Sequence, residues 1–191
     1  MTSPARKPLR ADALRNRERL LQVADEVFAS KGTDVSTEEI ARAAGVGIGT
    51  LFRHFPAKED LLEAVFVRRL AMVAEQARAL VATGDPGEAL FGFFSLAVSE
   101  SSAKNALAEA LEEAGVNVRV AGSAVGQEVR EALGELLAGA QRAGAVRDDI
   151  GVLELQALLV GASRAAQFAG DGPSVRARTL AVTLDGLRPR G

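Results

Sequence analysis

Three polar side chains near residue 50 carry groups that can bind a nucleic-acid duplex: the Thr50 hydroxyl, the Arg53 guanidinium and the His54 imidazole. All three can hydrogen bond to phosphate oxygens, and a guanidinium can also donate two hydrogen bonds to one guanine in a major groove. If the segment is helical, Leu51 and Phe55, four residues apart, face the core and leave the polar groups pointing outward. These residue types predict a DNA-contacting surface, on which Arg53 either reads a base or contacts phosphate or solvent.

The segment around these side chains, residues 36–58, predicts two short helices joined by a tight turn and followed by the start of a longer helix. Ser36 can cap the first helix, and Glu39, three residues later, would complete a capping box. Gly45 ends that helix where a left-handed backbone is needed, and Pro56 stops the second helix. This layout is that of a helix-turn-helix DNA-binding element.

The composition of the 191 residues is that of an ordinary folded protein, with 48% hydrophobic and 25% charged residues. No apolar run approaches the roughly 20 residues that span a bilayer, and the N-terminus lacks the apolar stretch of a signal peptide. The chain has no cysteine and one histidine, which argues against disulfides, thiolate or histidine-rich metal sites and a Ser-His-Asp triad. We therefore expect a cytoplasmic protein without metal or cofactor. An enzyme is the least favoured class.

Charge is distributed unevenly along the chain, although the net charge is only −2. Residues 1–70 carry 12 basic and 10 acidic side chains, whereas residues 71–191 carry 11 and 15. The basic side chains of the first twenty residues are Arg6, Lys7, Arg10, Arg15, Arg17 and Arg19. A basic segment in front of a helix-turn-helix would attract phosphate; the alternative is a solvated arm with no partner.

Helical spacing of apolar residues continues through the rest of the chain, without convincing β-alternation. The predicted helices cover about residues 10–30, 36–44, 48–54, 58–82, 86–101, 103–114, 119–143, 151–169 and 173–187. The predicted fold is therefore all-α with about nine helices. We expect three parts: a flexible basic arm (1–9), a three-helix DNA-binding domain with the helix-turn-helix (10–57), and a larger helical C-terminal domain (58–191).

Four runs of residues near the N-terminus occur together in a characteristic order and spacing. They are Ala24–Gly32, Ser36–Ala41, Ala44–Val46 and Gly49–Leu61. Together they resemble the tetracycline-repressor (TetR) family of bacterial transcriptional regulators, densely over about residues 10–65. Past residue 70 the resemblance rests on helix count and on the closing Leu184–Pro189 segment. It implies a homodimer whose C-terminal domains bind a small-molecule effector and whose N-terminal domains bind a palindromic double-stranded DNA operator, usually as a repressor.

The resemblance also implies roles for individual residues. Thr37 resembles the family's phosphate-contacting hydroxyl, and His54 and Lys58 resemble phosphate-binding positions. The recognition helix begins with Gly47, Ile48 and Thr50. Backbone amides and short side chains there can approach phosphates or base edges. Lys58 at a helix start is unfavourable for the macrodipole, which suggests an external anion. The alternatives are that Thr37 is only a cap and His54 only a surface residue.

Two positions depart from the family pattern. Phe52 stands where the family usually has tyrosine, so its ring can pack against the sugar-phosphate wall but cannot donate a hydroxyl hydrogen bond. Gly47 replaces a frequent serine and loses a capping oxygen. These departures motivate an alternative function, a helical ligand-binding or assembly protein whose helix-turn-helix has lost specific DNA binding.

The C-terminal domain offers candidate ligand contacts without a convergent motif. Phe91, Phe93 and Phe94 form either a pocket wall or ordinary core, and core is favoured. Polar residues that could orient a ligand are Ser95, Ser99, Asn105, Asn117, Gln127, Arg130, Arg164 and Gln167. The ligand contacts that we predict are Phe94, Asn117 and Gln127.

The last two predicted helices, 151–169 and 173–187, combine apolar residues with small residues that permit close helix approach. The resemblance implies that these helices from two subunits form a four-helix dimer interface. Packing within one subunit is the alternative. No membrane partner is expected.

Overall fold

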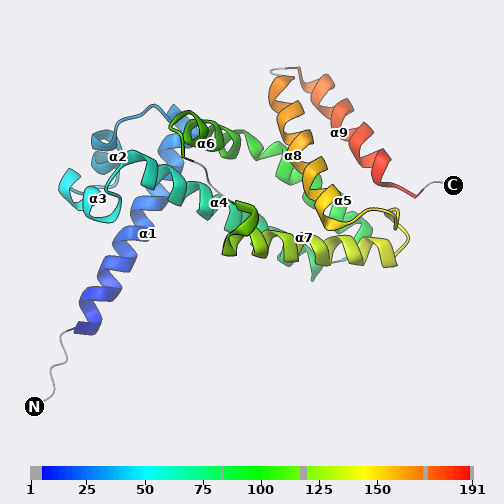
Figure 1. Cartoon of the computed structure of the whole chain (residues 1–191), viewed down its shortest axis with the longest axis horizontal. Helices are drawn as coiled ribbons and strands as arrows, with labels where there is room; N and C mark the ends of the chain where they lie inside the picture. The colour runs from blue at the N-terminus through cyan, green and yellow to red at the C-terminus, as the bar shows by residue number, and fades with distance from the viewer. Residues whose placement is uncertain (1–5, 83, 117–119, 170–171, 190–191) are drawn as a thin grey trace, which may run out of the picture. The chain divides into compact units, whose positions relative to one another are not determined.

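Every regular element of the computed structural model is helical within the residues that it describes, which are 6–82, 84–116, 120–169 and 172–189 (Figure 1). The elements are α1 (Arg6–Lys31), α2 (Thr37–Ala43), α3 (Ile48–His54), α4 (Lys58–Val81), α5 (Pro86–Ser99), α6 (Ser101–Glu113), the 3-10 turn η1 (Val120–Gly122), α7 (Ala124–Arg142), α8 (Val152–Phe168) and α9 (Pro173–Leu187). For this part of the chain, the all-α prediction with about nine helices is confirmed.

The helices form two compact units. Unit 1 contains Met1–Phe66 and Ala106–Val118, and unit 2 contains Val67–Asn105 and Arg119–Gly191, in each case as far as these residues are described. Helices α4 and α6 each contribute one end to unit 1 and the other end to unit 2. The division at residue 58 between DNA-binding and ligand-binding domains stays a prediction.

Unit 1 is built on an apolar core that holds its short helices. Helix α1 packs against α2, and α2 packs against α3. The buried side chains are Leu20, Leu21, Ala24, Phe28, Ile40, Ala41, Ala44, Leu51, Phe55, Leu61, Leu62 and Val65. Helices α2 and α3 have only seven residues each. Because isolated helices of that length are unstable in water, their burial against α1 and each other is what keeps them helical.

In unit 2, α5 packs against both α7 and α8, and α8 packs against α9. Its fully buried side chains include Leu90, Phe93, Phe94, Leu133, Leu136 and Leu155. Phe93 and Phe94 are each 1% exposed, so both are part of the core, as the favoured prediction has it. A hydrogen bond connects the end of α9 to the loop before α8: the backbone N–H of Arg147 donates to the Leu187 carbonyl at 2.9 Å.

Two helix starts differ from the sequence prediction by more than two residues. Helix α1 begins at Arg6 instead of near residue 10, so residues 6–9 of the predicted flexible arm are helical, and residues 1–5 lie outside the described residues. Helix α7 begins at Ala124, several residues after the predicted start at 119. Ser123 caps it by accepting the Gly126 N–H at 3.1 Å, and residues 120–122 form a separate turn. The local serine cap thus competes successfully with continuation of the helix.

Candidate nucleic-acid interface and ligand groove

The turn between α2 and α3 is closed around a left-handed glycine. Gly45 has a φ of 68°; its N–H donates to the Arg42 carbonyl at 3.1 Å, and the Val46 N–H donates to the Ala41 carbonyl at 3.0 Å. A residue with a Cβ atom is strained at this φ, which explains the requirement for glycine. The turn is the one expected of a helix-turn-helix.

Ser36 caps α2 as predicted, but the predicted capping box is wrong. The Ser36 Oγ accepts the Glu39 N–H at 3.2 Å. The Glu39 carboxylate is paired with Lys31 at the end of α1, and the hydrogen bond and charge of Lys31 lower the pKa of Glu39. The side chain that was expected to return to Ser36 therefore connects α1 to α2.

Helix α3 places its apolar side in the core and its polar side outward. Leu51 is 0% exposed and Phe55 is 2% exposed, as their four-residue spacing predicts. On the other side, Arg53 is exposed, Thr50 is half-buried and the Phe52 side chain is 40% exposed. Arg53 lies opposite Leu51, with Thr50 and Phe52 on its two flanks, so α3 offers a guanidinium, a hydroxyl and an aromatic ring. These groups suit phosphate, base and sugar contacts.

Basic side chains of α1 support this surface from within unit 1. The Arg17 guanidinium lies 5.1 Å from the centre of the Phe55 ring, a cation–π distance. His54 is half-buried, and its ring centre is 6.4 Å from that of Phe55. The Arg19 guanidinium lies beside the turn, 3.6 Å from where a Cβ of Gly45 would be. Arg17 and Arg19 of the basic N-terminal segment therefore pack on the helix-turn-helix, so this segment is not simply a solvated arm.

Two of the predicted phosphate contacts lie at helix starts. Thr37 begins α2, and its hydroxyl donates to the Glu38 carboxylate at 3.4 Å, so a phosphate would have to replace that acceptor. Lys58 begins α4 and is half-buried. Glu59 and Asp60 follow in the same turn. Because these carboxylates already balance the dipole of α4, the position of Lys58 does not by itself require an external anion.

The start of α3 has no side-chain cap. Gly47 precedes Ile48 with a φ of −73° and a ψ of 148° and makes no capping hydrogen bond. Nothing lies within 4 Å of the position that a Cβ of Gly47 would take. Gly47 is exposed and Ile48 is half-buried. The backbone here is accessible to an approaching phosphate, and there is also room for the serine that the sequence lacks.

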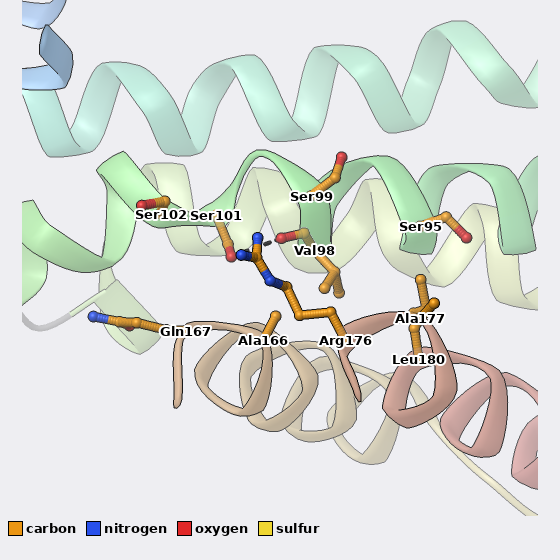
Figure 2. A pocket seen from close by; sticks show the side chains of 10 residues that line it. All are labelled: Ser95, Val98, Ser99, Ser101, Ser102, Ala166, Gln167, Arg176, Ala177 and Leu180. Atoms are coloured by element: carbon orange, nitrogen blue, oxygen red, sulfur yellow. Dashed lines mark hydrogen bonds between the residues drawn. The ribbon is translucent and has the colours of Figure 1, made fainter. Parts of the chain in front are cut away.

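Unit 2 contains an open groove of about 350 Å³ formed by four helices (Figure 2). It is lined by Ser95, Val98 and Ser99 from α5, Ser101 and Ser102 from α6, Ala166 and Gln167 from α8, and Arg176, Ala177 and Leu180 from α9. The Arg176 side chain extends from α9 towards Ser101 and Val98 (Figure 2). The groove therefore combines an apolar wall with hydroxyls, an amide and one guanidinium.

The predicted ligand contacts do not line this groove. Phe94 is in the core, and Gln127 is exposed on α7, where it donates to Glu131 at 2.9 Å. Asn117 lies outside the described residues. Three members of the wider polar set, Ser95, Ser99 and Gln167, do line the groove. Sequence reasoning missed Ser101, Ser102 and Arg176, because no local pattern connects the end of α5 with α9.

Helices α8 and α9 divide their apolar residues between two sides. Leu155, Leu159, Ala162 and Leu187 are buried inside unit 2, so part of the predicted interface packs within one subunit. The exposed set is Leu153 at 62%, Leu158 at 40%, Val160 at 53%, Phe168 at 96%, Val175 at 56% and Val182 at 67%. We call this exposed set the outer α8–α9 face.

Within the described residues, no helix is both long and apolar enough to cross a membrane. In the same residues, no three histidine, aspartate or glutamate side chains gather as metal ligands would.

Comparison with known families matches both units. Residues 20–65 match the family described as "Bacterial regulatory proteins, tetR family". Residues 85–189 match the family described as "Transcriptional regulator SbtR-like, C-terminal domain". The first match covers the helix-turn-helix, and the second covers more than half of the chain.

Solved structures extend the similarity to nearly the whole chain. A TetR transcription regulatory protein from Mycobacterium vanbaalenii is 44% identical, with a TM-score of 0.73, and the match covers 95% of this chain and 100% of that one. The TetR transcriptional regulator SCO0520 from Streptomyces coelicolor is 35% identical, with a TM-score of 0.69, over 92% of this chain and 99% of that one.

A curated relative is similar over the N-terminal region alone. An HTH-type transcriptional regulator from Staphylococcus aureus is 41% identical over 63 residues, which are 32% of this chain and 34% of that protein. The match thus spans about a third of the relative's length.

Proposed function

Because this chain belongs to the TetR family of transcriptional regulators, we propose that it is a ligand-responsive repressor that binds a palindromic operator as a homodimer. DNA binding, small-molecule binding and dimerisation are typical of the family. The observation that carries the proposal is the outward surface of α3, where Arg53 and Phe52 are exposed while Leu51 and Phe55 anchor the helix in the core.

In this proposal α3 enters the major groove and Arg53 reads a base. A guanidinium can donate two hydrogen bonds to one guanine, which gives sequence preference in addition to affinity. Thr50 and Ile48 approach base edges or the sugar-phosphate wall, and the Phe52 ring packs against that wall. Thr37, His54, Lys58 and the backbone at Gly47 contact phosphates. These contacts position the helix without specifying sequence.

The outer α8–α9 face supports the proposed homodimer. Apolar side chains such as Phe168, at 96% exposed, and Val182, at 67% exposed, are unfavourable in water. Covering them with the same face of a second copy would remove that cost and generate two-fold symmetry. Two-fold symmetry is what a palindromic operator requires, with reading helices about one helical turn, roughly 34 Å, apart.

Regulation by a ligand would require that the ligand binds the DNA-competent and DNA-incompetent states with different affinities. The groove between α5, α6, α8 and α9 is where we place that ligand. Helix α6 begins at the groove with Ser101 and continues through residues that belong to unit 1. A shift of α6 on ligand binding would therefore act on both units. We place the protein in the cytoplasm, where its operator is.

Selection of bound sequences from a random pool of double-stranded DNA tests the function. The full-length protein should enrich one palindromic sequence, protect it in a footprint and retain that selectivity as salt is raised. Binding that is weak, equal on all sequences and abolished by salt would contradict specific regulation. That result would favour a helical ligand-binding or assembly protein that has lost operator recognition.

A further inference from the structure

The groove in unit 2 has a chemical polarity that indicates its ligand. One wall is formed by Val98, Ala166, Ala177 and Leu180, which are apolar. Polar groups lie towards the start of α6 and the end of α8. Among the ten lining residues, Arg176 is the one charged side chain and none is a carboxylate. A ligand in this groove therefore meets a positive charge beside an apolar surface.

Three of the four serine hydroxyls that line the groove are already oriented by their own helices. Ser95 donates to the Phe91 carbonyl, Ser99 to the Leu96 carbonyl and Ser101 to the Val98 carbonyl, each at 2.8 Å. The Ser101 bond is drawn in Figure 2 beside the Arg176 guanidinium. Because these three hydroxyl protons are used within the helices, the guanidinium is the principal charged donor for a ligand's negative group, and the Ser102 hydroxyl is a neutral donor near it.

The amide of Gln167 is oriented by a buried side chain. Asn105 is 6% exposed, and its Nδ2 donates to the Gln167 Oε1 at 3.1 Å and to the Ser163 carbonyl at 3.4 Å. With its oxygen turned to Asn105, the Gln167 amide presents its NH₂ end to its other neighbours. This adds a second type of hydrogen-bond donor at the edge of the groove.

Positive charge also surrounds the start of α6. Ser101 lines a second, small cavity together with Lys104, Arg69 and Glu100. Burial, together with the nearby charge of Arg164, lowers the pKa of Lys104. The carboxylate of Glu100 accepts from Gln76 at 3.4 Å. An anion at the Ser101 end of the groove would reduce the repulsion among these cations.

We propose that this groove binds a small amphipathic organic anion, with its negative group at Arg176 and its apolar body along Val98, Ala177 and Leu180. The proposal rests on the ligand-responsive function proposed above and names the class of effector. A groove of about 350 Å³ is at the lower end of the range of roughly 300–1,000 Å³ for ligand sites, so it suits a compact molecule.

The proposed ligand and the proposed dimer do not compete for one surface. Along α9, Arg176, Leu180 and Leu187 follow helical spacing on the side that faces the groove and core. Val175 and Val182, seven residues apart, lie on the other side, in the outer α8–α9 face. Both sides of α9 can therefore be occupied at once.

The test uses matched probes with and without charge on the full-length protein. Benzoate, octanoate and phenyl phosphate are compared with benzamide and octanamide, and binding is followed by saturation-transfer NMR and by thermal stability. We expect the anions to bind at least about tenfold more tightly than the neutral amides, because hydrogen bonds to a charged group are the stronger kind. Failure of all three anions to bind, or equal binding of acid and amide, would overturn the proposal.

Paired variants locate the site. Arg176→Gln should weaken benzoate binding about tenfold or more, whereas Arg178→Gln, an exposed arginine on the same helix outside the groove, should leave it unchanged. Ala177→Phe should block the groove and abolish binding. Equal effects of the two arginine variants would contradict the assignment.

DNA binding measured without any anion separates this proposal from the proposed function. Arg178→Gln is expected to bind operator and to respond to benzoate as the wild type does, whereas Arg176→Gln should respond less to benzoate. If neither the wild type nor any variant binds DNA selectively, the proposed regulatory function is wrong. The anion titrations still show whether the groove binds an amphipathic anion.

Discussion

The outward surface of α3 and the outer α8–α9 face are both exposed helix surfaces, but they differ in what they expose. Around α3 the accessible groups are mixed, with Arg53 and Thr50 beside the single ring of Phe52. The outer α8–α9 face consists of apolar side chains, from Leu153 to Val182, although α9 also exposes Arg176 and Arg178. Polar and cationic groups suit a hydrated polyanion, whereas exposed apolar groups suit another protein surface. This difference is why we propose the first surface for DNA binding and the second for self-association.

The largest expected effect comes from removing the support beneath α3. Leu51 is fully buried, and Leu51→Ala should lower the free energy of unfolding by about 2–5 kcal/mol because it leaves a cavity under a seven-residue helix. Chemical denaturation measures the change. Phe52→Ala, at a side chain 40% exposed, should cost no more than about 0.5 kcal/mol. Equal losses would show that α3 does not depend on this core.

The next effect concerns the outer α8–α9 face. Phe168→Ser should raise the dimer dissociation constant about tenfold or more, because Phe168, 96% exposed in the single chain, would be buried in the proposed dimer. Sedimentation equilibrium measures the constant. Val81→Ser removes a side chain that is 46% exposed on α4 and serves as the control. If Phe168→Ser leaves the dimer dissociation constant unchanged, the dimer interface lies elsewhere.

On the proposed DNA surface of α3, Arg53→Ala should cost about 1–3 kcal/mol of operator binding and relax preference at one base pair. Fluorescence anisotropy on the operator and on single-base variants measures both quantities. Arg42→Ala, an exposed arginine on α2, should affect all sequences alike if it has any effect. A uniform loss with Arg53→Ala would mean that Arg53 binds phosphate and does not read a base.

Lys58→Ala tests a phosphate contact. Binding should weaken equally on all sequences, and the slope of log affinity against log salt should become shallower by about 0.9, the value for one neutralised phosphate. Titrations at several salt concentrations give the slope. An unchanged slope would remove Lys58 from the interface and leave it as part of the α4 start, beside Glu59 and Asp60.

The smallest expected effect is a gain in the stability of the folded protein. Gly47→Ser should stabilise the protein by a few tenths of a kcal/mol, because the backbone at Gly47 already has capping geometry and there is space for the side chain. Gly47→Ala, which fits but has no oxygen, is the control and should not stabilise. Thermal denaturation compares them. A similar result for both variants would show that the serine oxygen does not reach the start of α3.

Local patterns predicted much of unit 1. The start of α3 at residue 48 and its end before Phe55 follow from Gly47, the Leu51–Phe55 spacing and Pro56, and the structure has the helix at Ile48–His54. The Ser36 cap and the left-handed Gly45 were also predictable, because both depend on a few neighbouring residues. Glu39 was predicted wrongly, because its partner Lys31 is in another helix.

The sequence by itself determined the helical class, the helix-turn-helix and which side of α3 is buried, since each is encoded by spacing within about ten residues. Only the tertiary structure decided the groove, where residues from Ser95 to Leu180 meet through four packed helices. It also decided which apolar residues of α8 and α9 are buried and which form the outer face. Burial in a fold depends on contacts between distant segments, and helical periodicity alone does not specify the partner.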